Sequence, residues 1–281
     1  MLGTPFDQIK KSLSKNVPPE LIKHLPNTWE KVGEVLNIKL DCDLEKYQEK
    51  VCEKYAEILH CKTVLNNAGS ISGTYRKPKV DIIYGSKNTE TIHKENCIRF
   101  KLDPAKIMFS SGNMHERLRM ANVSNIDEIV VDLFAGIGYF TMPMAVYSKP
   151  RKIFACEINP VSYNFLCENI VLNDVTEIVE PLQGDNRNIA PKDVADRVVM
   201  GYLKDTFRFL PTAFNCLKNL KGIIHYHDVC PNESIPNRSF KFVQKESKKY
   251  NRKSELLTYR NIKSYAPGIS HVVLDVRIDE I

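Results

Sequence analysis

The chain has 281 residues, enough for one large domain or two modest ones. Hydrophobic residues make up 43% and charged residues 26%, as in ordinary soluble proteins, and no apolar run approaches the roughly 18 residues of a membrane span. The net charge of +6 suits an anionic partner without requiring one. The N-terminal residues lack the order of a secretion signal, and eight cysteines without a C-x-x-C pair signal neither zinc nor a disulfide framework, so we expect a cytoplasmic protein.

The first third of the chain predicts a small α+β domain over residues 1–100. Residues 32–40 alternate between polar and apolar as a strand does, and residues 44–59 have helical spacing. Shorter strand-like segments follow, separated by turn residues, at 63–65, 80–84 and 98–101.

Residues 101–281 have a different rhythm, in which helices and strands alternate. The expected strands lie at 128–132, 152–157, 178–182, 197–200 and 222–227, and the expected helices at 113–123, after Gly138, from Pro160 and around 205–219. Such alternation is typical of a mostly parallel sheet with helices on both faces. The runs 255–265 and 270–278 predict a closing antiparallel hairpin. This α/β outline is that of a Rossmann-like class I S-adenosylmethionine-dependent transferase rather than a dehydrogenase.

The most informative segment is Asp132 to Phe140, which follows a short apolar strand. Gly136 and Gly138 let the backbone turn sharply and approach a ligand closely before a helix opens. We expect this loop, including Phe134, to contact a nucleotide-type cofactor. The alternative is a tight strand-to-helix turn with no ligand.

Three acidic residues end consecutive predicted strands: Asp132, Glu157 and Asp185. Because the carboxyl ends of parallel strands line one crevice, we expect Glu157 to accept from the ribose hydroxyls and Asp185 from the adenine amino group. A single acid at a strand end is usually solvated or caps a helix, but three in register favour a site. The loop lacks a full G-x-G-x-x-G, which argues against a dinucleotide and for S-adenosylmethionine, since it has no pyrophosphate.

The fourth strand ends in Met200-Gly201-Tyr202. Transferases that act on amino nitrogens commonly place Asn or Asp here, so the segment argues against that chemistry. We expect Gly201 to leave room for a bulky planar base and Tyr202 to stack on it. The alternative is that Gly201 merely ends a strand.

Several segments together resemble one family, the tRNA wybutosine-synthesising aminocarboxypropyltransferases, notably the archaeal form. They are residues 29–40, Ser72-Gly73, 107–113 with Glu116-Arg117, 132–140, 157–160, 184–187 and His225-Tyr226-His227. The related tRNA guanine-N1 methyltransferases typically carry Asn-Leu-Pro in place of Met200-Gly201-Tyr202. One departure from the family is Ser111, where Pro is expected.

The resemblance implies cofactor contacts at Ser110, Arg117, Glu157, Asp185 and Asn186. A guanidinium at Arg117 would clasp the methionine carboxylate of S-adenosylmethionine; in isolation, a solvated helix arginine is the simpler interpretation. The implied reaction moves the 3-amino-3-carboxypropyl group to a carbon of 4-demethylwyosine at position 37 of tRNA-Phe and releases methylthioadenosine.

No residue stands out as a general acid or base. His225 and His227 share one strand face, but no third ligand lies near them in sequence, so we expect no metal. The competing functions are a tRNA guanine-37 N1 methyltransferase and a tRNA-binding protein with a degenerate transferase domain. The spent cofactor separates the first two, because only aminocarboxypropyl transfer leaves methylthioadenosine.

Three basic clusters fit an electrostatic footprint for tRNA, although any one of them is equally a solvated surface. They comprise Lys10, Lys11 and Lys15; Arg76, Lys77 and Lys79; and Lys241, Lys245, Lys248, Lys249, Arg252 and Lys253. The expected partner is the anticodon loop of tRNA-Phe, bound by a monomer, with the N-terminal domain as a further point of contact.

Overall fold

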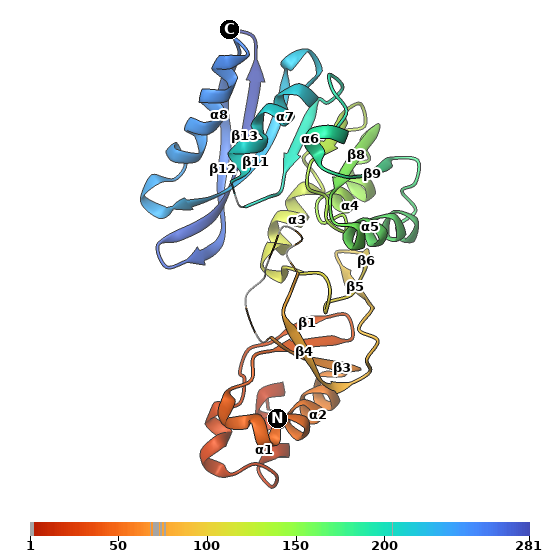
Figure 1. Ribbon diagram of the computed structural model, residues 1–281, viewed down its shortest axis with the longest axis vertical. Helices are drawn as coiled ribbons and strands as arrows, with labels where there is room; N and C mark the ends of the chain where they lie inside the picture. The colour runs from red at the N-terminus through yellow and green to blue at the C-terminus, as the bar shows by residue number, and fades with distance from the viewer. Residues whose placement is uncertain (1–2, 68, 70–72, 74, 76, 204) are drawn as a thin grey trace. The chain divides into compact units, whose positions relative to one another are not determined.

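The computed structural model describes residues 3–67, 69, 73, 75, 77–203 and 205–281, and Figure 1 shows it with labels on many of its helices and strands. The chain divides into two compact units, Met1–Ser111 and Gly112–Ile281. Within the part of the chain described, no helix has the length and apolar character needed to cross a membrane.

The described residues of the first unit form a four-stranded sheet, a strand pair and two α-helices. The sheet has the order β1-β2-β3-β4, with β1 (Glu30–Val32), β2 (Val35–Ile38), β3 (Thr63–Asn67) and β4 (Val80–Gly85). The pair consists of β5 (Thr91–Glu95) and β6 (Ile98–Leu102), and the helices are α1 (Pro5–Leu13) and α2 (Gln48–Leu59). Short 3-10 helices cover Pro19–His24 and Cys42–Tyr47. The α+β character predicted for this part of the chain is therefore confirmed.

The single strand predicted over residues 32–40 is instead a hairpin of β1 and β2. Gly33 forms the turn with φ +57°, a left-handed conformation that side chains rarely adopt. A Cβ at this position would lie 2.2 Å from Thr91 Oγ1, so the neighbouring chain also requires glycine. Alternation continues through such a turn, and it therefore could not reveal the break.

The described residues of the second unit form a seven-stranded sheet with the order β12-β13-β11-β10-β7-β8-β9. The strands from β11 to β9 run parallel, and β12 and β13 close the sheet as the predicted antiparallel hairpin. The strand bounds are β7 (Ile129–Asp132), β8 (Lys152–Glu157), β9 (Val179–Gln183), β10 (Arg197–Met200), β11 (Gly222–Pro231), β12 (Lys253–Ala266) and β13 (Ile269–Asp279). This mostly parallel sheet confirms the predicted α/β class.

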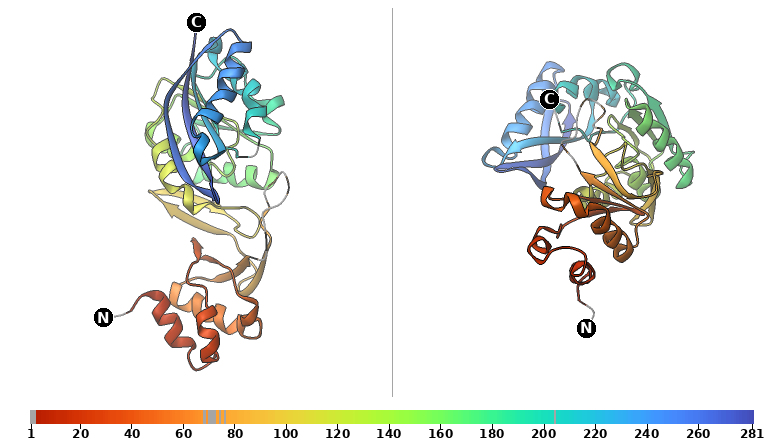
Figure 2. Two further views of the ribbon diagram at one scale, coloured as in Figure 1. Left: turned by 90° about the vertical axis from the view of Figure 1, so that its left-hand side faces the viewer. Right: turned by 60° about the horizontal axis from the view of Figure 1, so that its bottom comes forward.

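Helices pack on both faces of this sheet. They are α3 (Met114–Met120), α4 (Thr141–Pro143) continued by a π-turn at Met144–Ser148, α5 (Pro160–Leu172), α6 (Asn186–Ile189), α7 (Leu210–Cys216) and α8 (Asn237–Lys249). Figure 2 shows α3 and α8 on opposite sides of the β12–β13 hairpin. Apolar residues of β10, β11, β13, α7 and α8 form one continuous core, which fixes the strands beneath the site.

The register of the parallel strands brings their carboxyl ends to one edge of the sheet. Asp132 pairs with Val199 of β10 and with Ala155 of β8, and Glu157 pairs with Gln183 of β9. The loops that follow β7, β8, β9 and β10 therefore leave the sheet side by side.

Candidate cofactor and substrate site

The glycine loop after β7 is bonded to the strands on either side of it. The Leu133 amide donates to the Val199 carbonyl at 3.0 Å, and the Ala135 amide donates to the Cys156 carbonyl at 2.9 Å. The loop thus extends the sheet for three residues before it turns.

Both predicted loop glycines have positive φ, +60° at Gly136 and +99° at Gly138. A Cβ on Gly136 would lie 2.7 Å from the Tyr139 ring, and a Cβ on Gly138 would lie 2.8 Å from Met142 Cγ. The turn itself therefore requires these glycines, whatever ligand approaches the other side of the loop.

Asp132 is fully buried behind the loop. Its carboxylate accepts from the Thr141 hydroxyl at 2.8 Å and from the Phe134 amide at 3.2 Å. Burial raises the pKa of Asp132 to about 6, because the two hydrogen bonds only partly replace hydration. The side chain holds the loop from within, and a direct contact with a cofactor stays a prediction.

Glu157 joins the end of β8 to the glycine loop. Its carboxylate accepts from the Gly136 amide at 2.8 Å and from the Asn159 amide at 2.6 Å. Burial raises the pKa of Glu157, and the backbone donors offset part of that rise. A carboxylate can accept about four hydrogen bonds, so Glu157 retains capacity for ligand hydroxyls.

Asp185 and Asn186 begin α6 and behave differently. Asp185 caps the helix by accepting from the Arg187 amide at 3.0 Å, and its ion pair with the Arg187 side chain lowers the pKa of Asp185. The Asn186 side-chain amide donates to the Leu133 carbonyl at 2.8 Å. Its Oδ1 is buried and has no hydrogen-bond partner among the described residues.

The unpartnered Oδ1 of Asn186 fits a site for a ligand with N–H or O–H donors. A buried acceptor without a partner costs about 1 to 3 kcal/mol, which a bound donor would recover. Since Asn186 contacts the loop at Leu133 and Glu157 contacts it at Gly136, the structure brings both residues to the same glycine loop. An adenosyl group offers hydroxyl and amino donors of the required kind.

Aromatic rings cover the loop that follows β10. Tyr202 stacks on Phe134 with ring centroids 5.0 Å apart and an angle of 12° between the planes, and Phe209 packs edge-on against Phe134 at 4.9 Å. Gly201 does not border open space, because a Cβ there would lie 2.7 Å from the Phe140 ring. The Phe140 ring thus packs against Gly201 on the side where a Cβ would lie, and base binding by Gly201 and Tyr202 stays a prediction.

A buried polar network that the sequence did not reveal lies on the α3 face of the sheet. The Arg197 guanidinium donates to His225 Nε2 at 2.7 Å, so the proton of this neutral imidazole sits on Nδ1 and is donated to Asp275 at 2.5 Å. Burial alone would raise the pKa of Asp275, but His225 and Arg119 outweigh it and bring the pKa to about 2.

Arg119 connects this network to helix α3. Its guanidinium donates to Asp275 at 2.7 Å and to Glu116 at 2.6 and 2.9 Å. His227 lies 3.8 Å from Glu116 and 5.0 Å from the Phe140 ring, and burial lowers the pKa of His227 to about 3. The only signal in the sequence was the shared strand face of His225 and His227; their partners lie far away in the chain.

Two further predicted contacts fall near the boundary between the units. Arg117 of α3 is only 2% exposed, so the alternative of a solvated helix arginine is wrong. Ser110 belongs to the first unit, and its contact with a cofactor stays a prediction. Ser72 of the family pattern and Arg76 of the second basic cluster lie outside the described residues.

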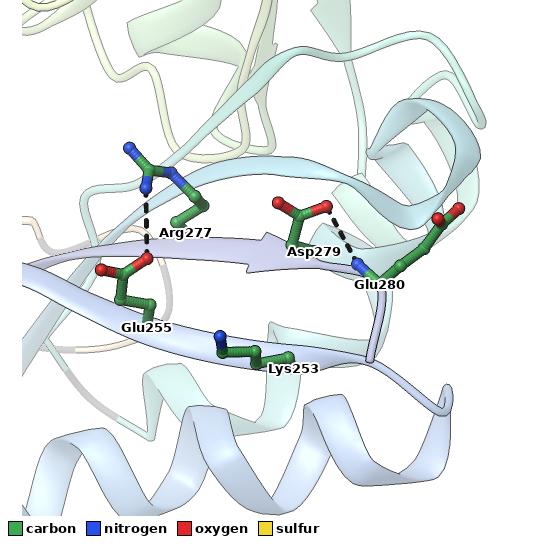
Figure 3. A pocket seen from close by; sticks show the side chains of 5 residues that line it. All are labelled: Lys253, Glu255, Arg277, Asp279 and Glu280. Atoms are coloured by element: carbon green, nitrogen blue, oxygen red, sulfur yellow. Dashed lines mark hydrogen bonds and ion pairs between the residues drawn. The ribbon is translucent and has the colours of Figure 1, made fainter.

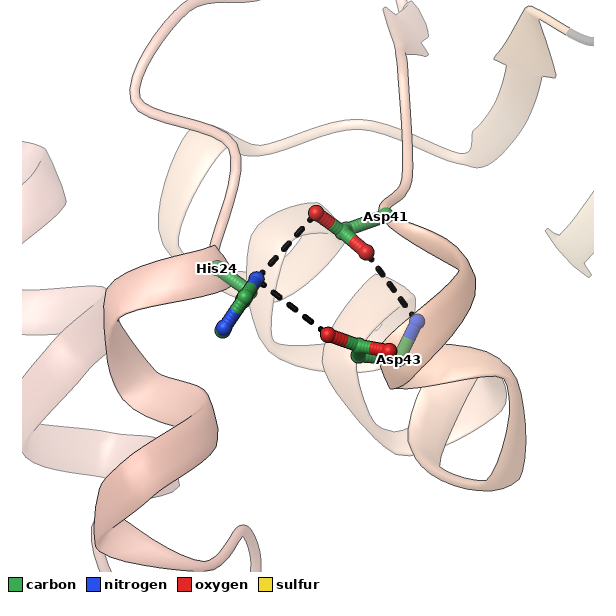
Figure 4. Close-up of side chains that lie close together, drawn as sticks. All are labelled: His24, Asp41 and Asp43. Atoms are coloured by element: carbon green, nitrogen blue, oxygen red, sulfur yellow. Dashed lines mark hydrogen bonds and ion pairs between the residues drawn. The ribbon is translucent and has the colours of Figure 1, made fainter.

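Among the described residues, one group of side chains in the first unit has the composition of a metal site. His24 Nδ1 lies 3.2 Å from Asp41 and 3.6 Å from Asp43 (Figure 4). These groups are partly exposed and pair with one another, and Asp41 also accepts from the Asp43 amide at 3.1 Å. The ion pairs account for the arrangement without a metal.

A surface hollow lies on the β12–β13 hairpin at the end nearest the C-terminus (Figure 3). It is lined by charged residues, and Arg277 pairs with Glu255 at 3.1 Å. Lys253 pairs with Asp279, and Gly222, the first residue of β11, pairs with the neighbouring Ile278. The hollow therefore lies where the parallel strands begin, at the opposite end of the sheet from the glycine loop. It is therefore separate from the candidate site.

Comparisons with known proteins agree along almost the whole chain. Residues 9–89 match the TYW2 N-terminal domain, and residues 91–257 match the TRM5/TYW2 methyltransferase domain. A Pyrococcus horikoshii tRNA(Phe) (4-demethylwyosine(37)-C(7)) aminocarboxypropyltransferase is 45% identical over 96% of this chain and 96% of its own.

Two solved structures are similar over their full lengths. The crystal structure of P. horikoshii TYW2 in complex with MeSAdo has a TM-score of 0.89 and 42% identity, and it covers 98% of this chain and 100% of its own. The crystal structure of M. jannaschii TYW2 in complex with AdoMet has a TM-score of 0.74 and 42% identity, with 90% of this chain and 100% of its own covered.

Proposed function

The chain belongs to the TRM5/TYW2 family, and we propose that it transfers the 3-amino-3-carboxypropyl group of S-adenosylmethionine to a carbon of 4-demethylwyosine at position 37 of tRNA-Phe. Methylthioadenosine is the second product. The observation that carries this proposal is the 45% identity, over nearly the entire chain, to a relative whose name states that reaction. Glu157 and Asn186 are both hydrogen-bonded to the glycine loop, and the Asn186 Oδ1 is buried without a partner among the described residues. These features support a site for the adenosyl group.

S-adenosylmethionine, when bound, supplies carbons activated by its positively charged sulfur, and position alone selects the carbon that is attacked. In our proposal Glu157 and Asn186 hold the adenosyl part from the loop side, because both retain acceptor capacity there. Asp132 keeps the loop in shape from behind, through Thr141 and the Phe134 amide.

The methionine arm requires a cation for its carboxylate, and we propose that Arg117 provides it. Arg117 is buried on α3, and the neighbouring Arg119 ties this helix to β13 through Asp275. The helix is thereby held in one place on the sheet, so Arg117 acts from a fixed position. Ser110, just before α3, is proposed to help hold the same arm.

The decisive experiment incubates the protein with tRNA that carries the precursor base and with S-adenosylmethionine labelled in its propyl arm. We expect the label in the nucleoside, a mass gain of one aminocarboxypropyl group in place of a hydrogen, and methylthioadenosine in solution. A parallel incubation uses tRNA with an unmodified guanosine at position 37. Label left in S-adenosylhomocysteine, with a methylated guanosine in that tRNA, would instead identify the tRNA guanine-37 N1 methyltransferase activity that the family name also covers.

A tRNA substrate further favours residence in the cytoplasm, and we propose that the protein acts as a monomer without a metal. Sedimentation of the protein at micromolar concentration tests the monomer. Transfer activity that persists after dialysis against a chelator tests the absence of a metal requirement.

A further inference from the structure

Strands β11, β12 and β13 extend well past the level at which β10 ends. Met200 is the last residue of β10 and pairs with Tyr226 of β11. At the same level, Leu274 of β13 pairs with Tyr226 on one side and with Tyr259 of β12 on the other. Residues 269–273 lie beyond that level, which corresponds to about 17 Å of strand. Figure 1 shows the hairpin turn at one end of the sheet and the C-terminus at the other. We call residues 259–266 of β12 the outer arm.

The composition of the outer arm suits a polyanion. No Asp or Glu occurs from Leu256 to Leu274, whereas Arg260 and Lys263 are cationic. Arg260 is exposed, and the same arm carries two exposed aromatic side chains, Tyr259 at 48% and Tyr265 at 56%. Cations next to exposed aromatic rings are the combination that binds single-stranded nucleic acid, through phosphate contacts and base stacking.

The outer arm also faces the candidate site along one row of the sheet. Arg260 pairs with Val273, which pairs with His227, so the three side chains lie on the same face. His227 contacts the Phe140 ring, and that ring fills the space beside Gly201. Three strand spacings separate β12 from β10, or about 14 Å, a distance that a few nucleotides span.

The edge of β12 is poorly suited to pairing with another protein strand. Its register with β13 shifts at three places, between Leu256 and Thr258, Asn261 and Lys263, and Ser264 and Ala266. Such irregularities interrupt the ladder of backbone donors and acceptors and protect an edge from strand addition. The exposed rings and cations are thus presented on an edge that does not extend the sheet.

We propose that the outer arm binds the single-stranded RNA that flanks the modified base, with Arg260 and Lys263 at phosphates and Tyr259 and Tyr265 stacked on bases. The proposal rests on tRNA being the substrate. It differs from the basic segment at the other end of the hairpin: Lys253 pairs with Asp279, level with the beginning of the parallel strands and far from the glycine loop. The exposed Lys218 lies just before β11 begins and belongs to none of the three basic clusters, so it supplies a matched control.

The test measures binding of tRNA-Phe and of its isolated anticodon stem-loop at several salt concentrations. Arg260→Glu should weaken both complexes about tenfold and lower the slope of log K against log salt by about 1 to 2. Lys218→Glu makes the same change of charge and should leave the stem-loop complex within about twofold. Equal effects of the two substitutions would overturn the proposal, since they would indicate general charge attraction.

The aromatic part is tested separately with Tyr259→Ala/Tyr265→Ala. Loss of stacking should weaken stem-loop binding at least tenfold at unchanged salt slope, whereas Tyr259→Phe/Tyr265→Phe, which keeps both rings, should bind as the wild type does. Calorimetry with S-adenosylmethionine, together with thermal unfolding, verifies that each variant folds. Wild-type affinity of the double alanine variant, or a concentration-dependent dimer that this variant abolishes, would refute RNA stacking.

Failure of the outer arm is distinguishable from failure of the proposed reaction. If the wild-type protein transfers the aminocarboxypropyl group and the arm variants bind RNA normally, the arm proposal alone is wrong. If the variants lose RNA binding as expected and the wild-type protein yields a methylated base, the arm proposal stands and the reaction is the methyltransferase one.

Discussion

Replacing Asp132 by asparagine removes a charge that the fold buries at a cost. The carboxyl is fully buried, and its pKa rises from 3.8 to about 6. Because the folded-state pKa is the higher one, protonation of Asp132 favours folding below pH 3.8, and that advantage disappears as the pH rises through 6. Above pH 7 the ionised group lowers the free energy of unfolding by about 3 kcal/mol, and at pH 5 by roughly half of that.

Asparagine has the same shape and does not titrate. Its Oδ1 can still accept from the Phe134 amide, while the Thr141 hydroxyl can rotate to accept from the new amide group. We therefore expect the stability of D132N relative to the wild type to increase by about 1 to 2 kcal/mol between pH 5 and pH 7.5. Urea unfolding at these two pH values measures the difference, in which contributions from other titrating groups cancel.

The control for this experiment is Thr141→Val. The Thr141 hydroxyl lowers the pKa of Asp132. The free energy of unfolding of the Thr141→Val variant should therefore fall more steeply with rising pH than that of the wild type. Parallel pH profiles for D132N and the wild type would refute the account of a strained buried carboxylate. Calorimetry adds a second result: nearly unchanged S-adenosylmethionine affinity in D132N is expected if Asp132 only supports the loop, and a large loss would indicate direct contact.

Three other substitutions test the rest of the site. Asn186→Leu should weaken S-adenosylmethionine binding at least tenfold by calorimetry, because it removes the buried acceptor; unchanged affinity would exclude Asn186 from the site. Asp275→Ala should lower the free energy of unfolding by about 3 to 5 kcal/mol in urea, since it removes one carboxylate partner of the buried Arg119 and the acceptor of His225 Nδ1. In the wild-type protein the contribution of Asp275 should be complete above pH 3.8 and disappear as the pH falls toward 2, because the folded-state pKa is the lower one; a D275A variant with the same acid unfolding profile would contradict this. Gly201→Ala should displace the Phe140 ring and lower the transfer rate more than S-adenosylmethionine affinity, and an unaltered rate would show that the contact is irrelevant to the reaction.

The sheet and its strand ends were predictable because parallel strands leave a strong signal. Apolar runs such as 129–131 and 153–156 are buried on both faces, and an acid or a glycine marks where each ends. Strand β5 gave no such signal. Its Thr91 and Glu95 are 6% and 8% exposed, whereas Ile92 is 44% exposed, so the usual relation between polarity and burial is reversed.

The buried network was out of reach for a different reason. Arg197, His225 and Asp275 come from three strands, and a single sequence carries no information on which distant residues meet. The sequence identified His225 and His227 as polar residues on one strand face but could not supply their partners. A similar limit applies to Gly201, since the Phe140 ring that fills its neighbourhood belongs to the loop after another strand.

The three strand-end acids have different environments, and burial distinguishes what each can do. Asp132 is fully buried, and its carboxylate accepts hydrogen bonds from residues of the loop and of α4. Asp185 pairs with the Arg187 side chain and caps α6. Glu157 accepts from the backbone amides of Gly136 and Asn159 and also interacts with that of Ile158. Asn186, bonded to the same glycine loop, offers a buried oxygen without a partner among the described residues. A ligand gains most from groups whose hydrogen-bonding capacity the protein leaves unused. We therefore expect Glu157 and Asn186, rather than Asp132, to account for most of the affinity for the adenosyl group.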